Sequence, residues 1–205
     1  MTHVELPQHW PLPDAIALRD ELQAAYDEPG RRYHGSRHLA EVLARLEELR
    51  GAGTSFEELP VTLAAWFHDS VYDGERDAEE RSAVWAEDAL AGRVEAPVVA
   101  EVARLVRLTE THRPDDADAN GCALSDADLA ILATGPERYA EYRAAIRDEY
   151  VHLAAEEFRN GRAQVLRHLL EKDTIFHTAY AREAWEAIAR ANLEAELLEL
   201  AEGQQ

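Results

Sequence analysis

The chain has 205 residues and a formal net charge of −20, from 21 Lys+Arg against 41 Asp+Glu. This length fits one domain with a substantial buried core. So many carboxylates repel polymeric phosphate, so we expect no nucleic-acid partner. A small anionic substrate remains possible where a bound cation reverses the local field.

The single cysteine, Cys122, has no partner for an internal disulfide and forms no cysteine cluster for structural zinc, which suits a reducing cytoplasm. The first residues lack the basic and apolar regions of a signal peptide, and no run approaches about 18 apolar residues. We therefore expect a cytoplasmic protein with no membrane partner. The sequence does not predict an oligomeric state.

Apolar residues recur at spacings of three and four almost throughout, in a composition rich in Ala, Leu, Glu and Arg. This pattern predicts an all-α fold in a single domain, residues 1–205. Prolines and glycines divide the chain into helices. The expected helices span residues 14–28, 36–50, 60–72, 77–92, 96–110, 125–133, 136–159, 161–172 and 178–202.

Three details of this pattern carry further expectations. Asp77, with a glutamate three residues later, matches a carboxylate version of the capping box and predicts a helix start at that point. Residues 113–123 form the one long polar connection. Leu193, Leu197 and Leu200 could make a short contact with a partner, but they are expected instead to pack the last helix onto its own domain.

Histidines and aspartates occur in an order that suggests one metal site. His68 and Asp69 are adjacent at the end of the apolar run 63–67. Burying both would cost several kcal/mol unless a cation or hydrogen bonds compensate. His34 and His38 stand four apart upstream, so both rings share a helix face if the helix begins by residue 34.

Asp126 and Asp128 supply carboxylates downstream. Two residues apart on a helix, they project about 200° from each other, so only one is expected to reach a given ion. Either could instead cap the helix start. His112 precedes them at a helix end, where it could reach the site or simply interact with the helix dipole. The whole set offers enough nitrogen and oxygen donors for one divalent ion.

At these residues the chain resembles the HD superfamily of metal-dependent phosphohydrolases, and within it a bacterial group of predicted metal-dependent HD phosphohydrolases. The superfamily signature is a histidine, an adjacent His-Asp pair and a distal aspartate on a helical bundle. The resemblance covers residues 33–193. Its pieces are Tyr33 to His38, Phe67 to Tyr72, Glu79 to Ala83, Thr109 to His112, Asp126 to Leu129, Gly161-Arg162 and Ala189 to Leu193.

The resemblance implies an all-α HD-type bundle that holds one metal ion. The implied ligands are His38, His68, Asp69 and Asp126, with Asp128 as the competitor of Asp126. Two-metal members carry further histidines before the last aspartate, and here only His112 lies in that interval. The chain also departs from the family pattern at Ala78, where an asparagine is expected.

The implied function is hydrolysis of a small phosphorylated compound, a nucleotide or another phosphomonoester or diester, by a metal-activated water. Mn, Fe, Ni, Mg and Zn are all compatible with histidine and carboxylate ligands. The residues expected to orient water or protonate the leaving group are His34, His112 and Glu79. Those expected to neutralise phosphate are Arg37 and Arg162.

Two other interpretations stay open. The same pocket could bind a nucleotide or regulate a partner without catalysis, because ligand residues show a capacity for metal and not turnover. An acidic helical scaffold with incidental histidines is the third interpretation, but it leaves the adjacent His68 and Asp69 unexplained.

Overall fold

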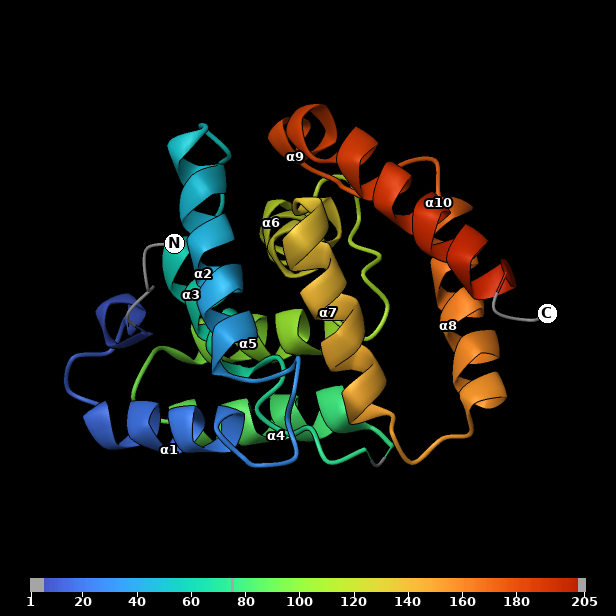
Figure 1. Cartoon of the computed structure of the whole chain (residues 1–205). Coiled ribbons are helices and arrows are strands. Elements are labelled where there is room, and N and C mark those ends of the chain that lie inside the picture. Colours follow the sequence, from blue (N-terminus) through green and yellow to red (C-terminus); the bar gives the residue numbers. More distant parts are fainter. Residues whose placement is uncertain (1–5, 75, 203–205) are drawn as a thin grey trace.

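The computed structural model describes residues 6–74 and 76–202, and within them 69% of the structure is helical with no strand. An isolated bridge between Ala91 and Val94 is the one extended pairing in the described residues. The expectation of an all-α fold is confirmed. Figure 1 shows the helices, with α1 and α4 along the bottom of the view and α8 and α10 at the right.

The helices follow one another closely along the chain. In order they are η1 (Leu6–His9), α1 (Ile16–Tyr26), α2 (Ser36–Gly51), α3 (Glu58–Phe67), α4 (Ala78–Leu90), α5 (Ala96–Leu108), α6 (Ala119–Leu129), η2 (Ala130–Ala133), α7 (Pro136–Glu149), α8 (Ala155–Leu170), α9 (Ala179–Ala184) and α10 (Glu186–Glu202).

The helix expected over residues 60–72 ends at Phe67, and the next two residues turn away from it. Two interactions explain the early end. The amide of Ser70 donates to the Phe67 carbonyl, a bond that closes a tight last turn. The guanidinium of Arg31 donates to the carbonyls of Asp69 and Ser70, which are then not available to continue the helix.

Helix α4 starts directly after Asp77, as expected, but without the expected capping bond, whereas α6 starts six residues earlier than expected. Asp77 has a left-handed backbone with φ 61°, and its side chain makes no capping hydrogen bond, so the predicted capping box is wrong. In contrast, the carboxylate of Asp118 accepts from the Gly121 amide at 2.9 Å and starts α6 at Ala119. The polar connection predicted over residues 113–123 is therefore shorter.

The predicted break at Gly161 is absent, because α8 runs through this exposed glycine. A glycine inside an exposed helix costs only about 1 kcal/mol, which the packing of α8 outweighs. The break lies earlier, after Glu149, where the guanidinium of Arg147 donates to the carbonyls of Tyr150 and Leu153. The last predicted helix is likewise divided, into α9 and α10, at Trp185.

Helix α3 is the centre of the core. Nearly all its side chains are buried, including Trp66 and Phe67, and it packs against α2, α4, α5 and α6. Buried apolar side chains from Leu6 to Leu193 join in one cluster. Leu193 is buried, and Leu197 and Leu200 pack against this cluster, as expected for the last helix. The carboxyl end of such a helix is a rigid place for polar side chains.

A buried ion pair joins α8 to α10, which lie side by side (Figure 1). Arg162 donates to both carboxylate oxygens of Glu196, at 2.8 and 3.1 Å, and to the Tyr142 hydroxyl at 2.9 Å. The Tyr139 hydroxyl donates to Glu196 at 2.6 Å. Arg162 was expected to bind substrate phosphate, but its donors already have buried partners, so its role here is structural.

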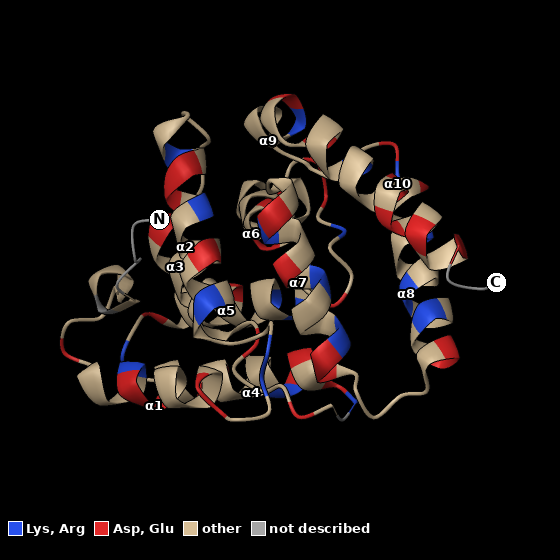
Figure 2. Cartoon of the chain, in the orientation of Figure 1, with Lys and Arg blue, Asp and Glu red and all other residues tan. Residues whose placement is uncertain are grey.

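Charged residues of both signs are interspersed along the helices in the view of Figure 2. Within residues 6–74 and 76–202, every helix is too short or too polar to cross a bilayer.

The Arg162 pair generates a stability prediction. Replacing Glu196 by alanine leaves the guanidinium buried without its counter-charge, so we expect a loss of about 3 kcal/mol or more in the free energy of unfolding. Denaturant titration followed by circular dichroism measures this loss. The matched control is Glu199→Ala, which removes an exposed partner of Arg143 and is expected to cost less than about 1 kcal/mol. Equal losses in the two variants would contradict the assignment.

Candidate metal centre

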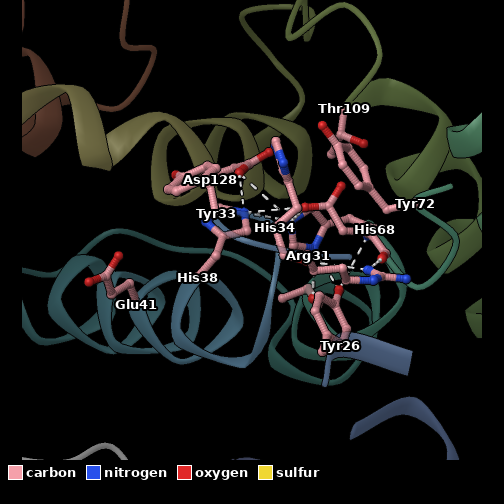
Figure 3. Close-up of polar contacts among 12 residues, drawn as sticks. Tyr26, Arg31, Tyr33, His34, His38, Glu41, His68, Tyr72, Thr109 and Asp128 are labelled. Atoms are coloured by element: carbon pink, nitrogen blue, oxygen red, sulfur yellow. Dashed lines mark hydrogen bonds and ion pairs between the residues drawn. The ribbon is translucent and has the colours of Figure 1, made fainter. Parts of the chain in front are cut away.

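Three helices bring four predicted ligand residues together. His38 comes from the first turn of α2, His68 and Asp69 follow α3, and Asp128 lies near the end of α6. Their side chains meet in the buried interior, as the dashed lines of Figure 3 show for the labelled members. His38 is 2% exposed and His68 is 1% exposed. Positions 38, 68, 69 and 128 are thus neighbours despite their separation in sequence.

The donor atoms stand at distances that suit one ion. The two Nε2 atoms are 3.1 Å apart, and the Asp69 Oδ2 lies 3.4 Å from His38 Nε2 and 3.2 Å from His68 Nε2. The Asp128 Oδ1 lies 3.0 Å from His38 Nε2 and 3.7 Å from His68 Nε2. Donors about 2.0–2.2 Å from a common ion stand about 2.8–3.6 Å apart. His38, His68 and Asp69 form a group that could hold a metal ion.

The tautomer of His68 also suits metal binding. Its Nδ1 lies 2.8 Å from the carbonyl oxygen of Ala65, and a carbonyl only accepts, so Nδ1 carries the proton. In a neutral ring, the lone pair is then on Nε2, which faces the other donors. A hydrogen bond of this kind from the outer nitrogen commonly orients histidines that bind metal.

The charges of the two histidines and two aspartates shift one another's pKa values. Burial lowers the pKa of His38, but hydrogen bonds with Asp128 and Asp69 outweigh it and raise this pKa to about 10. Burial raises the pKa of Asp128, yet His68 and His38 hold it well below its usual range, and the pKa of Asp69 is lowered in the same way. The two carboxylates therefore keep a positive charge beside them, which a divalent cation would supply in place of a proton.

The loop before α2 positions the His68 and Asp69 pair. Arg31, almost fully buried, binds the carbonyls of Asp69 and Ser70. The Asp69 amide donates to the Tyr26 hydroxyl at 3.2 Å. Gly35 permits the close approach of this loop, because a Cβ there would lie 3.1 Å from the Tyr26 carbonyl oxygen.

His34 lies at the edge of the cluster and forms a pair with Glu149. Its Nδ1 is 2.7 Å from Glu149 Oε2, and its ring stacks on Tyr72 with centroids 4.1 Å apart. The other Glu149 oxygen accepts from the backbone amides of residues 32, 33 and 34 at 2.8–2.9 Å. Burial raises the pKa of Glu149, but its bonds with His34 and these amides lower it to about 2. Glu149 thus orients His34 as an ionised carboxylate.

His112 reaches the site from the end of α5. Its Nε2 lies 3.5 Å from Asp128 Oδ2, and its backbone has φ 48°. Burial is the main reason why the pKa of His112 is lowered, which favours the neutral ring. Its Nδ1 is buried without a hydrogen-bond partner among the described residues.

Asp126 does not join the cluster, although it was preferred over Asp128. Its two oxygens accept from the backbone amides of His177 and Thr178, each at 2.7 Å. It anchors the segment before α9 on the other face of α6, as the angle of about 200° between the two positions allows. Asp128 is the aspartate that contacts the histidines, so the geometry corrects the preference for Asp126.

The remaining predicted site residues are not brought to the cluster. Arg37 is exposed and pairs with Glu41 and Glu141 at 3.1 and 2.9 Å. The side chain of Glu79, in the first turn of α4, makes no hydrogen bond or ion pair with the described part of the chain. Neither residue makes a hydrogen bond or ion pair with the four donors, so the roles expected for them toward substrate and water stay predictions.

Sequence reasoning missed Tyr26, Arg31 and Glu149. Each acts by binding backbone or a single side chain distant in sequence, for example Glu149 and His34, which are 115 residues apart. Such partners leave no spacing pattern in the sequence. The signal that marks Arg31 in the structure is the burial of its guanidinium. Burial of one side chain cannot be read from the sequence.

Comparison of the chain with protein-family models, curated proteins and solved structures finds no match.

The positions of Asp126 and Asp128 predict different effects of their amides. Asp128→Asn should weaken binding of Mn²⁺ by more than about tenfold, since even changes beyond the ligands commonly cost about 10–100-fold. Asp126→Asn should keep the ion but lose about 1–3 kcal/mol of stability, because one amide loses its acceptor. Calorimetric titration with Mn²⁺ and denaturant titration measure the two effects. The reverse pattern would restore Asp126 as the ligand.

The lowered pKa of Glu149 predicts a pH-dependent stability. A carboxylate with a depressed folded-state pKa stabilises the fold above its unfolded value of 4.5, and this contribution is lost as the pH falls through about 2. Glu149→Gln should therefore cost about 2 kcal/mol at pH 7 and clearly less at pH 3. Unfolding of the metal-free proteins at both pH values measures the difference. A cost independent of pH would contradict the ionised pair.

Proposed function

We propose that the protein is an HD-type metal-dependent phosphohydrolase that uses His38, His68, Asp69 and Asp128 to hold one divalent ion. The observation that carries this proposal is the group of His38, His68 and Asp69, whose donor atoms stand 3.1–3.4 Å apart, with Asp128 Oδ1 at 3.0 and 3.7 Å from the two histidine nitrogens. The order of these residues is the order of the HD signature, with Asp128 as the distal aspartate. The substrate is a small phosphorylated compound.

The donor set fits the chemistry of this class. Two imidazoles and two carboxylates suit Mn, Fe, Ni, Zn or Mg. An ion held by these four residues would lower the pKa of a coordinated water from about 15.7 towards about 7 and offset charge on a phosphoryl oxygen. The four residues hold their donor atoms in a rigid, buried arrangement, because two of them directly follow the buried α3 and two lie on α2 and α6.

The His34 and Glu149 pair supports catalysis rather than binding alone. Glu149 fixes the ring through Nδ1, which leaves Nε2 as the atom that can exchange a proton. In this role His34 takes a proton from the attacking water or gives one to the leaving group. His112, beside Asp128, is the second group that can orient water. A non-catalytic nucleotide-binding module is the alternative function. In such a module His34 has no role in proton transfer, and its pairing with Glu149 is structural only.

His34 and His38 provide the test. We expect His34→Ala to keep one ion per chain and to lose about 10²-fold or more in hydrolysis, the usual share of a general acid or base. His38→Ala should lose both the ion and activity. A panel of phosphorylated metabolites with Mn²⁺, assayed for phosphate release, identifies a substrate, and elemental analysis gives the metal content.

The control is His152→Ala, which alters an exposed histidine distant in sequence from the four donors. It should change neither quantity. Metal-replete protein that binds phosphorylated compounds and releases no phosphate would favour the non-catalytic module. Undiminished metal content in His38→Ala would contradict the proposed centre itself.

A further inference from the structure

Lys172 is the single lysine of the chain, beside 20 arginines. It follows α8, where a cation often serves only to bind the last helical carbonyls. That role is filled by Arg190, whose guanidinium donates to the carbonyls of Leu170, Lys172 and Asp173 at 2.7–3.2 Å. The Lys172 ammonium points elsewhere, so a helix-capping role does not account for it.

The Lys172 ammonium has one hydrogen bond, to the carbonyl oxygen of His112 at 3.1 Å. An ammonium has three N–H donors, so two remain. No carboxylate lies within 4.0 Å of it among residues 6–74 and 76–202. Burial and the charge of Arg113 both lower the pKa of Lys172. A half-buried cation beside a second cation is unfavourable until an anion joins them.

The groups around Lys172 include two imidazoles and a second cation, with Asp128 on the metal-centre side of His112 and Asp116 near His177. The charge of Lys172 acts on both His112 and His177, and burial lowers the pKa of each ring. Arg113 is exposed and contacts His168 at 2.8 Å between Nη2 and Nε2. Asp116 is the acid that acts on His177, and its side chain is 94% exposed in solvent. Lys172 and Arg113 thus place two positive charges close together in a chain whose net charge is −20.

Two buried imidazole nitrogens belong to this region. His112 Nδ1 and His177 Nε2 are buried and make no hydrogen bond with the described residues. The other ring nitrogen of His112, Nε2, lies 3.5 Å from Asp128 Oδ2. The backbone carbonyl of His112 accepts a hydrogen bond from the Lys172 ammonium. One histidine residue therefore spans the distance from the candidate metal centre to the ammonium.

We propose that Lys172 and Arg113 form an anion subsite that binds a second phosphoryl group of the substrate while the first lies at the metal centre. This inference rests on the proposed function. It narrows the substrate class to compounds with two phosphoryl groups, such as a nucleoside diphosphate or a bisphosphate. An ammonium binds phosphate as a point charge, and the guanidinium adds a planar pair of donors.

The unique lysine allows a direct test in the wild-type protein. Mn²⁺-loaded protein is acetylated with N-hydroxysuccinimidyl acetate, and peptide mass analysis gives the rate at Lys172. The α-amino group of the purified chain is the internal reference. Saturating methylenediphosphonate, a stable compound with two phosphoryl groups, should slow acetylation of Lys172 about tenfold or more, because few sites remain free. The reference rate should not change. Inorganic phosphate and malonate at the same concentration should protect much less.

Variants extend the test to the second cation. Arg113→Gln should weaken protection several-fold, whereas Arg93→Gln, which removes another exposed arginine without a carboxylate partner, should not alter it. An unchanged rate at Lys172 with diphosphonate, in protein that holds one Mn²⁺ per chain, would overturn the subsite and leave the proposed function standing. Equal protection by malonate would overturn its phosphoryl specificity. Protein that binds no Mn²⁺ would overturn both proposals.

Discussion

Two carboxylates facing two imidazoles in the protein interior impose the constraint on which the rest of the structure depends. Asp69 and Asp128 cannot both remain ionised there without a positive charge between them. The Nε2 atoms of His38 and His68 lie 3.1 Å apart. If both atoms carry lone pairs, the lone pairs repel each other unless a proton or a cation lies between them. The same arrangement that is unfavourable as bare protein is favourable as a set of metal ligands.

The surrounding elements hold these four groups close together. Helix α3 is buried almost throughout, so the turn that follows it has little freedom. Arg31 binds two carbonyls of that turn, and Ala65 fixes the proton of His68. On the far side of α6, Asp126 ties the segment before α9. The two aspartates of α6 thus have different roles: Asp128 contacts the histidines of the candidate centre, and Asp126 binds the backbone before α9.

Much of this could be predicted from the sequence, because helical periodicity and the adjacent His68 and Asp69 are local patterns. The all-α class followed from the periodicity, whereas the choice of His38 over His34 as the partner of this pair came from the resemblance to the HD signature. The choice between Asp126 and Asp128 followed from neither, since it depends on which face of α6 turns inward. Arg162 was misjudged for a similar reason, because its partner Glu196 lies on another helix. The end of α3 at Phe67 depends on Arg31, which no local pattern connects to it.

The most direct test of the central claim is a crystal structure of the protein soaked with Mn²⁺, with anomalous diffraction used to locate the ion. The account predicts one strong anomalous peak about 2.0–2.3 Å from Nε2 of His38, Nε2 of His68 and carboxylate oxygens of Asp69 and Asp128. A peak coordinated by Asp126 instead, or no peak among these side chains at saturating Mn²⁺, would contradict it.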